Sequence, residues 1–276
     1  MTIEYLSGNR LRGLSSDRES NSTLTFSDDF TSDNATDTHS ANIGVTGGKW
    51  EFDFKRDGTN DSSALDLGSA LSNTTWTIDF DFYLNAVTLG NIWGGFAISN
   101  QDETSSRESN SKHCIFMSIG GGTGGTDDNI SLETTYNAGT SNASSGGTQE
   151  FSTATVSADL TTHYCRMRRT SSTTADLTFY TTAARTTISE TLTMTDVNAL
   201  SVGYRYITIH NMDADSGGSG TLTGYIDNIK VYDTVTAPIT YPINDVVDGS
   251  IFYATDTNKS YVLYSGSWSE LWPLNI

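Results

Sequence analysis

The stretch WTIDFDFYL, Trp76 to Leu84, places apolar and polar side chains at alternate positions. A strand turns successive side chains to opposite faces of a sheet, so this pattern predicts a β-strand with one buried face and one polar face. The buried positions are Ile78, Phe80, Phe82 and Leu84, and the outward positions are Asp79, Asp81 and Tyr83. The first set therefore belongs to a hydrophobic core.

Similar short runs recur along the chain, among them KWEFDFKR, NIWGGFAIS, HCIFMSIG, ADLTFYTT and YRYITIH. Roughly ten such runs, joined by polar loops and with no convincing helix, predict an all-β fold with a two-sheet jelly-roll sandwich. In YCRMRR the same alternation buries Cys165 and Met167 and turns Arg166 and Arg168 outward. Together with Asp79, Asp81 and Tyr83, these arginines predict a polar and wet outer face.

Three regions follow from changes in composition. Residues 1–21 form a polar N-terminal arm, and residues 22–237 carry the strands of the sandwich. Pro238 and Pro242 then punctuate the chain before the last segment, 238–276, in which SIFYAT, SYVLYS and SWSELW predict a small C-terminal β-meander. A meander of roughly 35 residues is marginal alone, so we expect it to dock, with Trp268 and Trp272 as anchors. The arm is either free or a strand lent to a neighbour.

Charge narrows the range of partners. Fifteen basic and thirty-three acidic residues give a net charge of −18, which should repel nucleic acid and anionic membrane surfaces. No window is apolar enough to insert into a membrane, and the first residues lack the apolar run of a signal peptide. We therefore expect an exposed protein of a virion, assembled in the cytoplasm, or of a cell surface. The two cysteines, Cys114 and Cys165, are more simply core thiols than a bridge.

The last strand of the expected sandwich, GYIDNIKVYD, raises a question about one carboxylate. Strict alternation puts Tyr225, Asp227, Ile229 and Val231 on one face, and the apolar pair at its end makes this the buried face. An unpaired carboxylate is costly among core residues. The position of Asp227 therefore needs an explanation.

Several of these runs carry a family resemblance. FSDDF, WEFDFKRDGTNDSSALDLGS, WTIDFDFYL, IWGGFAIS and GYIDNIKVYD resemble the concanavalin A-like lectin/glucanase jelly roll in its laminin-G-like form, over roughly residues 24–234. The tail, DGSIFYATDTNKSYVLYSGSWSEL, is similar to short β modules at the ends of viral and archaeal surface proteins. The resemblance implies a structural calcium ion bound by Asp227 with backbone oxygens near Asp28 and Asp29. A hydrogen-bonded Asp at the sheet edge is the open alternative.

One loop matches a calcium-binding pattern only in part. The loop DADSGGSGTLTG puts Asp213 and Asp215 at the first and third positions of an EF-hand-like loop, but its twelfth position is Gly224 where a glutamate is needed. A plain acidic turn explains the same residues.

For enzymes of the resembled fold, the expected motif is two glutamates around an aspartate. In WEFDFKRD, Glu51 and Asp53 are followed by Lys55, so the second glutamate is missing. Asp79 and Asp81 are the remaining carboxylate pair for acid and base work across a sugar ring, although such pairs are more often the solvated side of a strand. We therefore predict that the protein is not an enzyme.

Sugar binding needs an aromatic platform with polar groups beside it. Trp93 lies on the opposite strand face from Phe96 and Ile98, next to small glycines, and a tryptophan packed under a loop is its alternative role. We predict a ligand site at Trp93, Asp79, Asp81 and Tyr83. The expected function is a non-enzymatic attachment or structural protein that binds host-surface glycan and forms homo-oligomers or joins other virion or envelope proteins. A monomeric carbohydrate-binding module and a glycoside hydrolase are the alternatives.

Overall fold

The computed structural model describes sixteen stretches of the chain. These are residues 4–6, 10–13, 24–32, 42–55, 61–88, 93–102, 114–121, 128–135, 152–153, 161–185, 187–195, 203–211, 220–233, 249–254, 259–264 and 267–271. Regular structure in these stretches consists of strands alone. The chain divides into two compact units, one made of residues 23–183 and 187–235 and the other of residues 1–22, 184–186 and 236–276. Within the described residues, no helix has the length and apolar character needed to cross a membrane.

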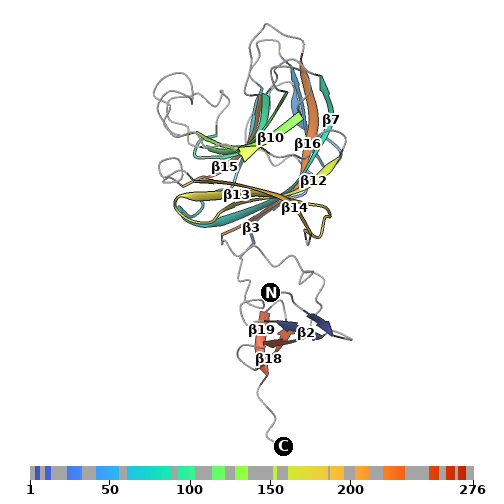
Figure 1. Ribbon diagram of the computed structural model, residues 1–276, viewed down its shortest axis with the longest axis vertical. Coiled ribbons are helices and arrows are strands. Elements are labelled where there is room, and N and C mark those ends of the chain that lie inside the picture. Colours follow the sequence, from blue (N-terminus) through green and yellow to red (C-terminus); the bar gives the residue numbers. More distant parts are fainter. Residues whose placement is uncertain are drawn as a thin grey trace, which may run out of the picture. The chain divides into compact units, whose positions relative to one another are not determined.

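The larger unit contains an eight-stranded sheet (Figure 1). Seven strands follow one another in the order β14 (Ile188–Thr195), β13 (Thr174–Tyr180), β12 (Thr162–Arg169), β7 (Trp76–Thr88), β16 (Thr221–Tyr232), β5 (Trp50–Lys55) and β4 (Ile43–Val45), and β3 (Leu24–Asp28) pairs with β16. All neighbouring strands are antiparallel. The long strand β7, which contains the WTIDFDFYL stretch, lies in the middle of this sheet.

A second, six-stranded sheet forms the other layer. Its order is β11 (Ser152–Thr153), β10 (Asp128–Thr135), β9 (Cys114–Gly121), β8 (Trp93–Ser99), β15 (Tyr206–Asn211) and β6 (Ser62–Asp66), again with antiparallel neighbours. Figure 1 shows β15 and β10 in one layer and β7, β12, β13 and β16 in the other. The predicted all-β, two-sheet jelly-roll sandwich is therefore confirmed.

The core lies between the two sheets. The four apolar positions predicted for the central strand, Ile78, Phe80, Phe82 and Leu84, are all fully buried. Phe80 of β7 stacks on Phe96 of β8 with ring centroids 4.0 Å apart, so this contact joins the two sheets. Aromatic side chains bury large apolar areas, and such contacts supply much of the stability of a sandwich.

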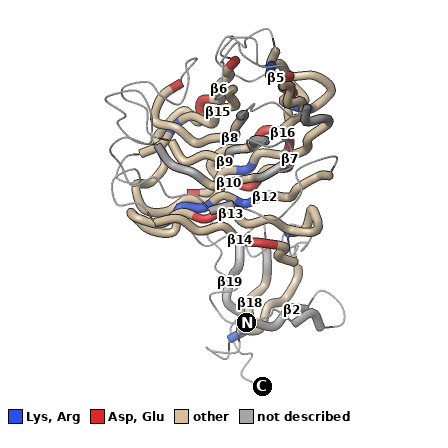
Figure 2. The backbone as a smooth tube through the Cα atoms, turned by 45° about the horizontal axis from the view of Figure 1, so that its top comes forward, with Lys and Arg blue, Asp and Glu red and all other residues tan. Residues whose placement is uncertain are grey.

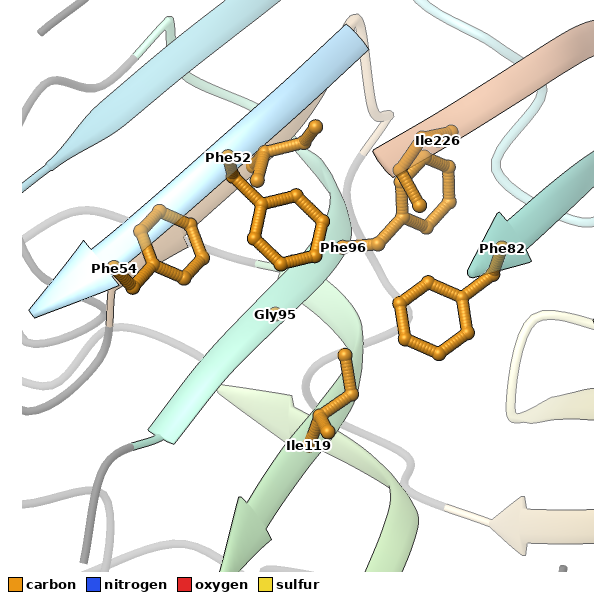
Figure 3. Close-up of a pocket in the computed structure, with 8 residues that line it drawn as sticks. Phe52, Phe54, Phe82, Gly95, Phe96, Ile119 and Ile226 are labelled. Atoms are coloured by element: carbon orange, nitrogen blue, oxygen red, sulfur yellow. The ribbon is translucent and has the colours of Figure 1, made fainter. Parts of the chain in front are cut away.

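A small apolar gap lies within the same core. Figure 3 shows Phe52, Phe54, Phe82, Phe96 and Ile226 around it, with side chains that come from both sheets. Its lining consists of Phe52, Phe54, Phe82, Gly95, Phe96, Ile119, Ile209 and Ile226. Among the described residues, no polar side chain lines the gap, so they offer nothing with which to orient a polar ligand.

The smaller unit is a five-stranded sheet in the order β1 (Glu4–Leu6), β2 (Arg10–Gly13), β17 (Ile251–Ala254), β18 (Lys259–Tyr264) and β19 (Ser267–Leu271). The last three strands form the predicted antiparallel meander. Strand β2 pairs in parallel with β17, so residues of the expected N-terminal arm and of the C-terminal module belong to one sheet. Phe252 and Tyr261, which face each other across β17 and β18, are buried. The expected anchors Trp268 and Trp272 have side chains outside the described part.

The two cysteines lie in different sheets. Cys114 belongs to β9 and Cys165 to β12; both are buried, and they are not joined by a disulfide. Cys114 packs with Ala97 and Phe116 in a small cluster of its own, whereas Cys165 belongs to the main core.

Candidate binding surface on the eight-stranded sheet

A β-bulge in β16 answers the question of why Asp227 lies among core residues. Asp227 pairs with Asp81 and Lys230 pairs with Asp79, so three steps along β16 face two steps along β7. The extra residue is Asn228, whose φ of 53° lies in the left-handed region that asparagine tolerates better than most residues.

This bulge overturns the alternation expected for the last strand. Ile226 is buried before the bulge, and Ile229 and Val231 are buried after it. Tyr225 and Asp227 therefore lie on the outer face, opposite to the buried face that strict alternation predicted. The physical reason is that one extra residue shifts the period-two phase, so the two halves of the strand obey it separately.

Two tyrosines lie side by side on this outer face. Tyr83 of β7 and Tyr225 of β16 are direct cross-strand partners, and their rings stack with centroids 5.1 Å apart and planes 17° apart. The ammonium group of Lys49 lies 4.1 Å from the centroid of the Tyr225 ring. All three side chains are half-buried, so each is fixed by packing while part of it stays in solvent.

A carboxylate and an amide lie next to the tyrosine pair. Asn228 Nδ2 donates to Asp81 Oδ2 at 2.9 Å, and the backbone N–H of Asn228 donates to Asp227 Oδ1 at 2.7 Å. The bulge thus points the Asn228 side chain toward β7 and holds the Asp81 carboxylate in one orientation. We call the group Lys49, Asp81, Tyr83, Tyr225 and Asn228 the Tyr83 surface.

Burial and nearby charges at the edge of the Tyr83 surface shift the pKa of Asp227 upward. Burial raises the pKa of Asp227 above its ordinary value of 3.8, and the nearby carboxylates of Asp81 and Asp29 raise it further. The hydrogen bond from Asn228 and the charge of Lys49 lower the pKa in part. The carboxylates of Asp81 and Asp29 therefore repel that of Asp227, and a cation or a hydrogen-bond donor from a ligand would relieve this repulsion.

The prediction that the whole outer face is exposed to solvent is wrong at Asp79 and Arg166. Arg166 Nε and the second guanidinium nitrogen, Nη2, donate to the two oxygens of Asp79 at 2.6 and 2.7 Å. Asp79 is 4% exposed and Arg166 is 2% exposed, so the pair is shielded from solvent although it points away from the core. Asp79 was predicted as a ligand-binding residue, and its carboxylate is engaged with Arg166.

A second ion pair lies beside the first. Arg168 of β12 makes a two-pronged contact with Asp176 of β13, at 2.8 and 2.9 Å, and Figure 2 marks the charged residues along these two strands. Paired guanidinium and carboxylate groups cancel each other's charge. This part of the outer face is therefore a fixed network, and the adjoining Tyr83 surface is the part with groups turned to solvent.

The aspartates near the start of the domain, which the resemblance places beside a calcium ion, accept hydrogen bonds from their own turn. Asp28 is buried, and its Oδ1 accepts the backbone N–H of Phe30 at 2.7 Å, while Asp29 Oδ1 accepts the backbone N–H and the hydroxyl of Thr31. Among the described residues, no three His, Cys, Asp or Glu side chains are arranged to hold a metal ion. Calcium at Asp227 would depend on backbone oxygens, and it stays a prediction. Asp213 and Asp215 lie outside the described residues.

The remaining predicted ligand residue belongs to the other sheet. Trp93 begins β8 and pairs with Gly120 of β9, so it is not on the sheet that carries Asp81 and Tyr83. Its side chain lies outside the described part. The structure thus brings Asp81 and Tyr83 together and places Trp93 elsewhere.

Tyr225, Asn228 and Lys49 were not singled out from the sequence as ligand residues. The sequence does contain one signal for the bulge, the Asp-Asn dipeptide inside a strand. Asparagine adopts the left-handed conformation more readily than most residues, and this bulge requires that conformation. Recognising the bulge turns Tyr225 outward and places it beside Tyr83. Lys49 has no comparable signal, since its contact with Tyr225 depends on the pairing of β5 with β16.

Comparison with known proteins gives likenesses of fold. No protein-family model and no curated protein matches the chain. Among solved structures, a legume lectin-like domain from Entamoeba histolytica is 12% identical with a TM-score of 0.47, over 70% of this chain and 87% of that one. A family 7 alginate lyase, A1-II′, is 10% identical with a TM-score of 0.45, over 72% and 84%.

A third match is the CBM2 module of the evolved Dit protein of Lactobacillus casei BL23 phage J-1. It is 12% identical with a TM-score of 0.41, over 75% of this chain and 95% of that one. The lectin-like structure is of the jelly-roll kind that the sequence resembles. At these identities and TM-scores, none of the three carries a conclusion about activity or ligand.

Proposed function

We propose that this chain is a non-enzymatic surface protein that binds carbohydrate at the Tyr83 surface and serves attachment or structure on a virion or cell envelope. The observation that carries the proposal is the preformed combination of a stacked tyrosine pair with a fixed carboxylate–amide pair on the outer face of the eight-stranded sheet. Binding sites gain affinity when their groups are held in place before the ligand arrives.

Carbohydrate fits the chemistry of the Tyr83 surface. A sugar ring has apolar C–H patches that pack on aromatic rings and hydroxyl groups that both donate and accept hydrogen bonds. Tyrosines offer an apolar body with a polar tip, Asp81 accepts, and Lys49 donates. The stacked rings share a face, so a ligand would contact their edges and their hydroxyl groups.

The position of Asp79 supports the non-enzymatic part of the proposal. The glycosidase alternative uses Asp79 and Asp81 as an acid and base pair, and such a pair needs both carboxyl groups beside the sugar. Asp79 is buried and engaged with Arg166 on both oxygens. A buried carboxylate held in this way has no route to a glycosidic oxygen.

We assign attachment to a virion or envelope to the smaller unit. The strands near both ends of the described chain are joined in one sheet, separate from the sandwich that carries the Tyr83 surface. This division fits a protein in which one unit attaches to the virion or envelope and the other binds the ligand. We propose that the smaller unit forms homo-oligomers or attaches to other envelope proteins. Light scattering that finds only a monomer, with and without calcium, would favour the monomeric binding-module alternative.

Glycan-array binding tests the carbohydrate proposal. We expect wild-type protein to bind, and Tyr83→Ala and Tyr225→Ala each to weaken binding about tenfold or more, with circular dichroism unchanged. Tyr206→Ala is the matched control, because Tyr206 is a half-buried tyrosine on the six-stranded sheet. Loss of binding in Tyr206→Ala with retention in both other variants would move the site to the other sheet, where Trp93 lies.

A further inference from the structure

A buried carboxylate lies at the end of the sandwich where four strands begin or end. Asp61 immediately precedes β6, Asn42 immediately precedes β4, Lys55 ends β5 and Asn211 ends β15. Asp61 is 1% exposed. Hydrogen bonds connect these four residues into one cluster at this rim.

The donors in the cluster are directed to particular oxygens. Asn42 Nδ2 donates to Asp61 Oδ2 at 2.9 Å, the backbone N–H of Asn211 donates to the Asp61 carbonyl at 2.8 Å, and Asn211 Nδ2 donates to the Lys55 carbonyl at 3.1 Å. Asp61 Oδ1 is left with no hydrogen-bond donor among the described residues, although it is fully buried. The cluster is therefore rich in oxygen acceptors and short of donors.

No cationic side chain of the described residues compensates Asp61. The lysine of the cluster, Lys55, directs its ammonium group to Asp53 Oδ2 at 3.0 Å, where both side chains are nearly half exposed. A buried carboxylate with one oxygen unbonded is costly, and native proteins satisfy such groups with a partner, a water molecule or an ion.

We propose that Asp61 anchors a calcium-binding site at this rim of the sandwich. Calcium is a hard cation that takes carboxylate, amide and backbone carbonyl oxygens together, at about 2.3–2.6 Å, and it accepts irregular geometry. Asp61 Oδ1 supplies the negatively charged ligand, and the amide oxygen of Asn42 and nearby carbonyl oxygens supply neutral ones. A net charge of −18 on the chain favours the approach of divalent cations.

This site is distinct from the one implied by the resemblance. Asp227 lies in β16, where it pairs with Asp81 of β7 on the eight-stranded sheet, and Asp61 lies beside β6 at the edge of the six-stranded sheet. The two carboxylates can therefore be removed separately. Their substitutions serve as each other's control.

Thermal unfolding with calcium and with chelator tests the site. At a calcium concentration about 100 times Kd, we expect the midpoint of wild-type unfolding to rise by roughly 5–10 °C. Asp61→Asn should lose this rise and, in chelator, should be at least as stable as wild type, because a buried carboxylate oxygen without a hydrogen-bond donor is gone. A merely structural role for Asp61 would instead lower the midpoint equally in both conditions. Asp227→Asn should keep the part of the rise that Asp61→Asn loses.

Any other pattern overturns the assignment. Absence of a calcium effect in wild-type protein, or a rise that survives Asp61→Asn, removes calcium from Asp61. Wild-type crystals grown with terbium in place of calcium give a second test that needs no variant. An anomalous peak about 2.5 Å from Asp61 Oδ1 supports the proposal, and crystals without a peak at this position contradict it.

Discussion

Arg166 and Asp79 face each other across β12 and β7 and form a two-pronged ion pair that is shielded from water on the outer side of the sheet. Each group depends on the other, because a charge buried alone loses its hydration without gaining a partner. The pair therefore fixes the register of two central strands as well as their charge balance.

Breaking this pair should cost more than replacing it. We expect Asp79→Ala to lower the free energy of unfolding by about 3–5 kcal/mol, because Arg166 is then buried without its partner. The double change Asp79→Leu with Arg166→Met should restore most of that loss. Urea denaturation of the variants measures both effects. An equally small loss for Asp79→Ala and for the more exposed Asp176→Ala would show that burial adds nothing.

The raised pKa of Asp227 predicts a stability change with pH. The folded protein binds this proton more tightly than the unfolded chain, so the stabilising contribution is present below the ordinary value of 3.8 and is lost as pH rises through the folded pKa. In chelator, Asp227→Asn should therefore be the more stable protein at pH 7, by on the order of a few tenths of a kcal/mol because the group is partly solvated. The difference should vanish near pH 3.

Asp66 provides a control of opposite sign. The hydrogen bond from Arg205, at 2.6 Å, lowers the pKa of Asp66. Its contribution is present above the ordinary pKa and lost as pH falls through the lowered value. Asp66→Asn should thus be the less stable protein at pH 7, and urea midpoints between pH 3 and 7 compare the two variants. A parallel response in both would contradict the assignment at Asp227.

Gly224 allows β16 to approach β7 closely. A Cβ atom at this position would collide with the backbone carbonyl of Tyr83 and would lie 2.8 Å from Phe52 Cζ. We expect Gly224→Ala to destabilise the sandwich by about 1–3 kcal/mol, because backbone cannot move aside cheaply. Gly44→Ala is the matched control, since nothing lies within 4 Å of its added Cβ atom. Thermal melts compare the two, and equal midpoints would rule out the predicted clash.

The sequence predicted the sandwich because its signal is local. Each apolar position of β7 can be read from the alternation of Trp76 to Leu84, and all of them are buried as expected. In β16 the same rule failed at Asn228, because a bulge is invisible to a strict period of two. The prediction that the outer face is exposed to solvent was wrong at Asp79 for another reason. Its burial depends on a guanidinium group 87 positions away, and alternation along one strand says nothing about the partner strand.

The candidate site shows the same limit. Asp81 and Tyr83 were predicted from their own strand, whereas Tyr225 and Lys49 reach them only through the pairing of β16 with β7 and β5. The pairing of β2 with β17 was likewise not predicted. The two strands are far apart in the sequence, and neither contains a pattern that identifies the other as its pairing partner.

The parallel pairing of β2 with β17 has a consequence for the order in which the chain folds during synthesis. Residues 10–13 leave the ribosome early, but their partner strand, residues 251–254, is made only after every strand of the sandwich. At roughly 5–20 residues per second, β2 waits on the order of 12–48 s for β17. The sandwich between them has all of its strands by then. The smaller unit is therefore completed after the sandwich, and a released chain that ends before Ile251 has every strand of the sandwich but leaves β1 and β2 without β17.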